Sequence, residues 1–257
     1  MTERHGKIPE WYNKDSKNYD AFNENTDNSR TTNSTIEKIL KQHKVKTVLD
    51  LTCGTGSQVF WLAKHGYQMT GSDISPGMLN VAKRKAKKEK INVPFLLGDM
   101  RTIKVGTFDA ALTIFNAVGH LTKAGFEKTM RNVCANLHDG GIYVFDIFNR
   151  SYLTHDNNIT KLSIEWIRIV GDIKLREIQH SIIDYKGLLV SYTTNYEQKS
   201  SGKLKASKSV GTLQTYTAKE LQEMLVRNGF KVLGQYAMDG SKFLEKETER
   251  ILTVAKK

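Results

Sequence analysis

The sequence predicts an α/β protein with a mostly parallel sheet and helices on both faces. Three observations support this prediction. From residue 47 onward, short apolar segments alternate with segments of helical periodicity, which is typical of a parallel sheet covered by helices. The first apolar segment passes directly into the glycine turn Gly54-Thr55-Gly56, and a second segment ends about 20 residues later at an acidic residue, Asp73.

The predicted strands are short segments rich in β-branched and other apolar residues. In chain order they are Val48–Leu51, Gln68–Asp73, Phe95–Leu97, Phe108–Phe115, Ile142–Phe148, Lys231–Tyr236 and Ile251–Ala255. Helices are predicted between them, and a further helix is expected to end near Gln42. Ser75-Pro76 suits a helix start, because serine caps free N–H groups and proline fits the first helical position. Thr217 and Glu220 have the spacing of a capping box, which predicts the start of the last helix.

Residues 161–216 lack helical periodicity and interrupt the alternation. β-branched and aromatic residues alternate there with polar ones, and residues 186–187 and 200–203 have the composition of turns. We therefore expect a small antiparallel β insertion after strand five, near the strand ends where open α/β folds bind ligands. The expected division is a cofactor-capping segment and helix at 1–45, a core at 46–160 and 217–257, and a substrate lid at 161–216. A dimer surface is the alternative role for the insertion.

The glycine turn indicates a ligand that approaches the backbone closely, since glycine has no Cβ. A dinucleotide-binding turn has a third glycine three residues after the second, and this chain has Val59 there. A carboxylate at Asp50, just before the turn, is unfavourable beside a pyrophosphate but suits a cationic group. Asp73 is placed to bind ribose hydroxyls. These residues predict a pocket for an adenosine cofactor with an ammonium or sulfonium group, such as S-adenosylmethionine.

The strand with its glycine turn, then Asp73, then Gly98-Asp99-Met100, resembles the motifs of class I S-adenosylmethionine-dependent methyltransferases in order and spacing. The resemblance runs from about residue 11 to the C-terminus. It implies a Rossmann-like seven-stranded sheet, S-adenosyl-L-methionine as the cofactor and transfer of its methyl group. The residues expected to contact the cofactor are Tyr19, Arg30, Asp50, Thr52, Cys53, Gly54, Gly56, Asp73, Ile74, Met78, Asp99, Met100 and Phe115.

The resemblance also implies individual roles for some of these residues. Asp50 is expected to bind the cofactor ammonium, Asp73 the ribose diol and Asp99 the adenine amino group; a turn cap is the alternative for Asp99. Arg30 is similar in position to an arginine that glycine N-methyltransferases place on the cofactor carboxylate, and a surface cation is the alternative. Cys53 is expected to be a small turn residue rather than a nucleophile, because no histidine neighbours it in sequence.

Acceptor residues are implied by a closer resemblance to the glycine/sarcosine and aminosugar N-methyltransferases. Asn116-x-x-x-His120-Leu121 is similar to their motif, in which the asparagine faces the substrate amine. His120 is expected to act either as a base or as a structural hydrogen-bonding group, and Tyr216 is a candidate pocket wall. Glycine N-methyltransferases carry a carboxylate-binding arginine where this chain has Phe148, which puts glycine as the substrate in doubt; Arg150 is a candidate replacement.

Composition limits the partners and the compartment. The chain has 257 residues, two cysteines and a formal net charge of +12. It has neither a signal-peptide-like N-terminus nor a run of about 18 apolar residues, so a cytoplasmic protein without a membrane partner is expected. We expect no metal, since no cluster of ligands has metal-binding spacing near the fourth strand. A homodimer is left open.

The reaction predicted from these residues is methyl transfer to a small-molecule acceptor, with an amine nitrogen preferred. Two alternatives keep the enzyme class: a small-molecule O-methyltransferase, for which a hydroxyl acceptor would need a stronger base, and an RNA or ribosome-associated methyltransferase. The positive charge favours a nucleic-acid partner, but its densest run, residues 83–90, is expected to be a solvated helix face without base-stacking aromatic residues. A non-catalytic, cofactor-binding subunit is a third alternative.

Overall fold

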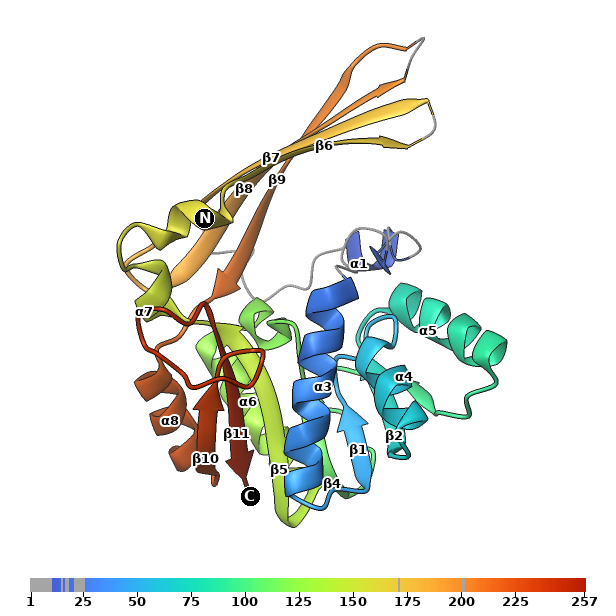
Figure 1. Cartoon of the computed structure of the whole chain (residues 1–257), viewed down its shortest axis with the longest axis vertical. Coiled ribbons are helices and arrows are strands. Elements are labelled where there is room, and N and C mark those ends of the chain that lie inside the picture. The colour runs from blue at the N-terminus through green and yellow to red at the C-terminus, as the bar shows by residue number, and fades with distance from the viewer. Residues whose placement is uncertain (1–10, 15, 17–18, 21–25, 171, 200–201) are drawn as a thin grey trace.

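The structure, a computed structural model, describes residues 11–14, 16, 19–20, 26–170, 172–199 and 202–257. A seven-stranded sheet forms the core, with the order β10-β11-β5-β4-β1-β2-β3, and a separate four-stranded sheet has the order β6-β7-β8-β9 (Figure 1). This arrangement confirms the predicted fold class, including the antiparallel insertion after strand five.

The core strands are β1 (Thr47–Asp50), β2 (Gln68–Asp73), β3 (Phe95–Leu97), β4 (Phe108–Thr113), β5 (Leu137–Phe148), β10 (Lys231–Tyr236) and β11 (Arg250–Lys256). The first five pair in parallel, whereas β11 runs antiparallel to both β5 and β10. The carboxyl ends of the parallel strands therefore meet at one edge of the sheet. Because β11 is antiparallel, its first residue, Arg250, lies at this same edge, opposite Phe148 of β5.

Helices cover both faces of this sheet, as the alternation predicted. The helices are α3 (Thr26–Gln42), α4 (Ser57–Lys64), α5 (Pro76–Glu89), α6 (Lys123–Ala135) and α8 (Ala218–Arg227). The first three pack on one face and the last two on the other. Successive strand residues point to opposite faces, so Val48 joins the first core and Leu49 the second. The basic run of α5 is mostly exposed, as expected for a solvated helix face.

Two helix starts have the caps that the sequence predicts. Ser75 accepts a hydrogen bond from the backbone N–H of Met78 at 3.2 Å, and Pro76 follows at the first helical position of α5. Thr217 and Glu220 form a reciprocal capping box at α8. Each cap satisfies backbone N–H groups that have no partner within the helix.

Strand β4 ends two residues earlier than predicted. Phe115 and Asn116 both have left-handed backbone conformations, with φ of 62° and 59°, so the extended strand cannot continue through them. A short 3-10 helix, η2 (Ala117–His120), begins immediately afterwards. This turn carries Asn116 and His120 to the carboxyl edge of the sheet. Strand β5, in contrast, begins earlier than predicted, because Leu137 already pairs with Phe108.

The inserted sheet projects away from the core as a long arm (Figure 1). Its strands are β6 (Ile164–Val170), β7 (Ile173–Ile183), β8 (Leu188–Lys199) and β9 (Lys205–Gln214), and all neighbours are antiparallel. The connection from β5 contains α7 (Arg150–Leu153) and η3 (Asn158–Leu162). Strand β9 of the arm contacts η2. Among the described residues, no helix has the length and apolarity needed to cross a membrane.

Candidate active site

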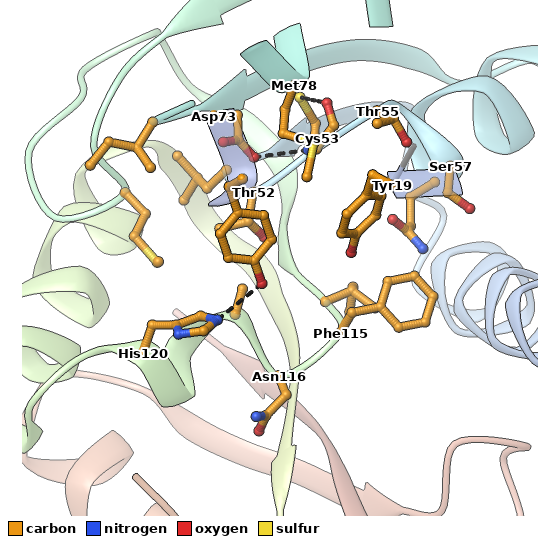
Figure 2. Close-up of a pocket in the computed structure, with 18 of the residues that line it drawn as sticks. Tyr19, Thr52, Cys53, Thr55, Ser57, Asp73, Met78, Phe115, Asn116 and His120 are labelled. Carbon is orange, nitrogen blue, oxygen red and sulfur yellow. Dashed lines mark hydrogen bonds between the residues drawn. The ribbon is translucent and has the colours of Figure 1, made fainter. Parts of the chain in front are cut away.

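A cavity of about 430 Å³ lies at the carboxyl edge of the core sheet. The predicted residues that line it are Tyr19, Thr52, Cys53, Gly54, Asp73, Ile74, Met78, Asp99, Met100, Phe115, Asn116 and His120. They come from the end of β2, from the segments that follow β1, β2, β3 and β4, from α5 and η2, and from Tyr19 near the N-terminus. Figure 2 draws 18 of the lining residues around the cavity and labels ten of them. The tertiary structure thus brings together residues separated by up to about one hundred positions.

The glycine turn is held to the next strand by its own backbone. The N–H of Gly54 donates to Oδ2 of Asp73 at 2.9 Å, and the N–H of Cys53 donates to the carbonyl of Ser72 at 2.9 Å. Gly54 has a φ of 53° and lines the cavity, where no other atom lies within 4 Å of the place of a Cβ. The open side of the turn is therefore available to a ligand, as the sequence predicts for a backbone that approaches a cofactor closely.

Gly56 has a different role from Gly54. A Cβ at Gly56 would lie 2.4 Å from the ring of Phe60, and its φ is 99°. The residue does not line the cavity. Because Gly56 has no Cβ, the turn can pack tightly against Phe60 of α4. Gly56 therefore influences ligand binding indirectly, through the shape of the turn.

Asp73 lines the cavity with a carboxylate that is largely surrounded by protein. Oδ1 accepts the N–H of Ser75 at 2.8 Å, and Oδ2 accepts that of Gly54. Burial raises the pKa of Asp73, and these backbone hydrogen bonds oppose the rise. A carboxylate offers about four acceptor positions, so positions remain for the two hydroxyls of a ribose.

Asp50 lies behind the turn and is fully buried, outside the lining of the cavity. Oδ1 accepts the N–H of Thr52 at 3.1 Å, whereas Oδ2 has no hydrogen-bond partner among the described residues. Burial raises the pKa of Asp50 to about 7. An unpartnered buried carboxylate oxygen is costly, and a nearby cationic ligand would offset that cost. The unpartnered carboxylate oxygen of Asp50 therefore fits a positively charged cofactor.

Asp99 is engaged by its neighbour Arg101. The Nε of Arg101 donates to Asp99 Oδ1 at 2.9 Å, and Nη2 donates to Oδ2 at 2.5 Å. Partial burial works to raise the pKa of Asp99, but the hydrogen bonds and charge of Arg101 outweigh it and hold that pKa below its usual value. Both residues line the cavity. The sequence prediction missed Arg101, which occupies much of the capacity that Asp99 would offer an adenine amino group.

Described residues of the N-terminal segment contact α5 and the glycine turn. Helix α1 (Trp11–Lys14) lies on the start of α5, where the hydroxyl of Ser75 donates to Asn13 Oδ1 at 2.6 Å. A Cβ at Gly77 would lie only 2.7 Å from the carbonyl of Asn13, so glycine permits this approach. Further along, Asp20 accepts a hydrogen bond from Thr55 at 2.5 Å and pairs with Lys85. These contacts place tyrosines 12 and 19 on the cavity.

His120 and Tyr12 form a hydrogen-bonded pair inside the cavity. The hydroxyl of Tyr12 lies 3.1 Å from Nε2 of His120, and the two rings are arranged edge to face with their centres 5.6 Å apart. Burial, together with the charges of Tyr19 and Asp73, raises the pKa of Tyr12 above its ordinary value. Tyr12 therefore stays protonated near neutral pH, and the imidazole is the group of this pair that can accept a proton.

Asn116 forms part of the cavity wall, but its amide is directed away from the other labelled side chains (Figure 2). Its Oδ1 accepts the N–H of Phe148 at 3.0 Å, and its own N–H donates to Asp146 at 3.1 Å. These bonds attach the left-handed turn to β5. The resemblance implied that Asn116 faces the substrate amine; in the structure its amide oxygen binds the backbone of β5.

Three residues considered from the sequence lie away from the cavity. Arg30 is exposed and does not line it. Tyr216 is fully buried in the core, where its ring meets that of Phe126 at 5.7 Å. Arg150 pairs with Glu220 at 2.6 Å, on the side of α8. Their contact with a ligand stays a prediction that the geometry does not favour.

Other lining residues were not selected from the sequence. They are Tyr12, Asp20, Ser29, Leu51, Thr55, Ser57, Gln58, Arg101, Ile114, Ala117, Leu121, Phe148, Leu213 and Arg250. Phe148 carried a weak signal, because it stands where glycine N-methyltransferases have an arginine. Leu213 and Arg250 carried no local signal, since each reaches the cavity only through strand pairing. Cys53 lines the cavity, and burial raises the pKa of its thiol, which agrees with a non-nucleophilic role.

Residues 48–141 match the family described as Methyltransferase domain. The chain is 25% identical over 256 residues to a protein of Geobacillus sp. (strain WCH70) named as a methyltransferase, covering 96% of this chain and 97% of that one. It is 32% identical over 113 residues to a ubiquinone biosynthesis O-methyltransferase of Coxiella burnetii, covering 42% and 46%. A glycine N-methyltransferase of Oryctolagus cuniculus is 26% identical over 132 residues, covering 45% of each chain.

Solved structures share the whole fold. An S-adenosylmethionine-dependent methyltransferase from Clostridium acetobutylicum aligns with a TM-score of 0.75 at 18% identity, covering 95% of this chain and 98% of that one. The sugar N-methyltransferase KedS8 from Streptoalloteichus sp. aligns with a TM-score of 0.73 at 16% identity, covering 99% and 95%. At these identities the likeness establishes the fold. Residues 48–141 thus carry a methyltransferase domain, and the whole chain has the fold of S-adenosylmethionine-dependent methyltransferases.

Proposed function

We propose that the protein is an N-methyltransferase that acts on the amine nitrogen of a small molecule. The observation that carries this proposal is the hydrogen-bonded pair of Tyr12 and His120, which faces the same cavity as the glycine turn. A neutral amine is the nucleophile in such a transfer, so a group that accepts the amine proton is needed near the acceptor. The cavity volume of about 430 Å³ suits a small molecule beside a cofactor.

The cofactor is proposed to lie along the ends of β1 and β2. Gly54 would receive its amino-acid part, Asp73 its ribose and Ile74 with Met78 its adenine, while the unpartnered oxygen of Asp50 favours its positive charge. When bound, S-adenosylmethionine supplies a methyl group that is already activated on a sulfonium. The protein has to align the acceptor with that methyl group and exclude water.

On the acceptor side, the chain's own groups have distinct tasks. The hydroxyl of Tyr12, kept protonated by burial, orients the imidazole of His120. In the tautomer that donates Nε2–H to the Tyr12 oxygen, Nδ1 of His120 carries the lone pair that accepts the amine proton. Burial of the acceptor favours its neutral form, because desolvation disfavours the ammonium. Positioning of the two reactants supplies a further part of the rate enhancement, up to roughly 7–11 kcal/mol in favourable systems.

The inserted sheet is proposed to enclose the acceptor from one side. Leu213, near the end of β9, contributes to the cavity, and β9 contacts η2 beside His120. The rest of the arm extends away from the core. The proposed lid is therefore the base of the arm, formed by the start of β8 and the end of β9, rather than the whole insertion.

A screen with radiolabelled S-adenosylmethionine tests this function. Primary and secondary amines, aminosugars, their hydroxyl analogues and bulk tRNA would be offered to the full chain. We expect label in an amine and none in its hydroxyl analogue, and we expect Asp73→Ala to lose cofactor binding. Asp139→Ala is the matched control, because the side chain of Asp139 is almost fully exposed. Label only in hydroxyl analogues or only in tRNA would overturn the proposal.

A further inference from the structure

Arg250 reaches the active-site cavity from the strand beside β5. It is the first residue of β11 and the cross-strand partner of Phe148, and both residues line the cavity. Its side chain is 22% exposed, so the guanidinium is largely surrounded by protein. The sheet order places β11 on the far side of β4 from β1 and β2, whose ends carry the proposed cofactor residues. Arg250 therefore lies on the acceptor half of the cavity.

The guanidinium is fixed in orientation by two neighbours. Nε donates to Oδ2 of the buried Asp146 at 2.8 Å, and Nη2 donates to the same oxygen. On the other side, the guanidinium carbon lies 5.7 Å from the centre of the Phe115 ring. A guanidinium has five N–H donors in a rigid plane, and within the described residues Nη1 makes no hydrogen bond to the protein. Nη1 therefore remains as a donor on a residue that lines the cavity.

The charges of the cavity are separated in a way that suits two different ligands. Carboxylates of Asp50 and Asp73 lie at the ends of β1 and β2, where a cationic cofactor is proposed. Arg250 lies at the start of β11, which β5 and β4 separate from β1 in the sheet. Its positive charge lowers the pKa of Tyr19, although burial outweighs this effect. The cationic group of Arg101, in contrast, is turned onto Asp99 on the cofactor side.

We infer that Arg250 determines acceptor specificity by binding an anionic oxygen group, a carboxylate or a phosphate, on the amine that is methylated. This inference rests on the proposed function, since it names the substrate class of the same site. Two oxygens of a carboxylate or a phosphate can accept parallel N–H bonds from a guanidinium, and these hydrogen bonds are charge-assisted. Asp146 acts as a positioning residue, because it orients the guanidinium without lining the cavity.

Matched amine pairs test the inference. The pairs are β-alanine and propylamine, O-phosphoethanolamine and ethanolamine, and glucosamine 6-phosphate and glucosamine; the first pair probes carboxylate and the others phosphate. For the wild type we expect kcat/KM to favour the charged member of at least one pair. In Arg250→Lys, which keeps a charge but loses the fork, this preference should fall on the order of 100-fold through KM, as for loss of a charge-assisted contact.

A second variant keeps the inference testable if Arg250→Lys fails to fold. Asp146→Asn combined with Arg250→Gln removes both charges, so that no unpaired carboxylate remains buried. We expect the double variant to bind S-adenosylhomocysteine as the wild type does and to use charged and uncharged amines equally. Arg227→Gln is the matched control, because Arg227 pairs with Glu127 on the exposed surface.

The outcomes separate this inference from the proposed function. A wild type that uses both members of every pair equally, or a preference that survives in the double variant, would overturn the role of Arg250 while leaving N-methylation intact. If none of the six amines is methylated, the pairs are compared by the thermal midpoint of the S-adenosylhomocysteine complex. Stabilisation by charged members that is lost in the double variant supports the inference, and its absence overturns it. If the wild type does not bind S-adenosylhomocysteine, the cofactor assignment is contradicted instead.

Discussion

The backbone N–H of Gly54 donates to the carboxylate of Asp73 at 2.9 Å, which joins the turn after β1 to the end of β2. This bond couples the two halves of the proposed cofactor site, because the residue that would bind ribose also holds the glycine turn in place. A change at either residue should therefore affect both the shape of the turn and the affinity for the cofactor.

Replacing Asp73 with asparagine should weaken cofactor binding more than it weakens the fold. The amide keeps one acceptor for the N–H of Gly54 but loses the charge and the second acceptor for Ser75. We expect the Kd of S-adenosylhomocysteine, measured by calorimetry, to rise by about 10- to 100-fold, the range for losing 1.4–3 kcal/mol. The control is Asp139→Asn on the exposed surface. An unchanged Kd in Asp73→Asn would contradict the ribose assignment.

Gly56→Ala should destabilise the protein through a steric clash. The new Cβ would lie 2.4 Å from the ring of Phe60, in addition to the strain of a φ of 99°. Gly66 is a matched control, because its φ is 89° but no atom lies within 4 Å of the place of a Cβ. By urea denaturation we expect Gly66→Ala to cost about 1 kcal/mol of unfolding free energy and Gly56→Ala about 1–3 kcal/mol more. Equal losses would show that α4 can move away from the turn.

Asp50 should make the stability of the protein without cofactor fall as the pH rises from about 4 to about 7. Burial raises its pKa from 3.8 to about 7, so the native state holds a proton that the unfolded state has released in this range. The stability is thus fully present below the unfolded pKa and is lost as the pH rises through the folded one. The full shift corresponds to at most about 4 kcal/mol.

Asp50→Asn removes this titration and gives the test. At pH 8 we expect the variant without cofactor to have the higher free energy of unfolding, measured in urea, because no buried carboxylate has to ionise. The same variant should bind S-adenosylmethionine more weakly than the wild type, since the proposed attraction for a cation is lost. If Asp50→Asn is less stable than the wild type at pH 8, the ionised carboxylate must be stabilised by more than the hydrogen bond from the N–H of Thr52.

A pH–rate profile should distinguish the contribution of His120 from that of Tyr12. His120→Asn removes the group that accepts the amine proton, and we expect kcat to fall by about 100-fold, with loss of the ascending limb that a general base produces. Tyr12→Phe removes only the hydrogen bond at 3.1 Å, so the limb should remain while kcat falls less. Single-turnover kinetics at several pH values measure both effects. If the limb persists in His120→Asn, another group accepts the proton.

Leu213→Ala tests the base of the arm as a wall of the acceptor site. We expect the KM of the acceptor to rise several-fold, because apolar contact is lost, while the Kd of S-adenosylhomocysteine stays unchanged. Leu204→Ala is the matched control, since Leu204 is exposed near the outer end of β9. An effect on the cofactor alone would place Leu213 on the wrong half of the cavity.

Much of the cofactor half could be predicted from the sequence because its residues follow one another closely along the chain. A strand followed at once by the turn at Gly54, and a second strand that ends at Asp73, bring these two residues together once the strands pair in parallel. The caps at Ser75 and Thr217 are equally local, since each involves residues within one helical turn. The fold class followed from the alternation of patterns, which depends on the same short range.

The acceptor half depended on tertiary structure. Arg250 enters the cavity because β11 turns antiparallel beside β5, and nothing near residue 250 in the chain indicates that pairing. Tyr216, which looked like a pocket wall, is instead buried against Phe126, because the residue after an inserted sheet can face either way. Local sequence thus determined which strands and turns form, whereas packing of distant strands decided which side chains surround the acceptor, since that choice depends on contacts between residues far apart in the chain.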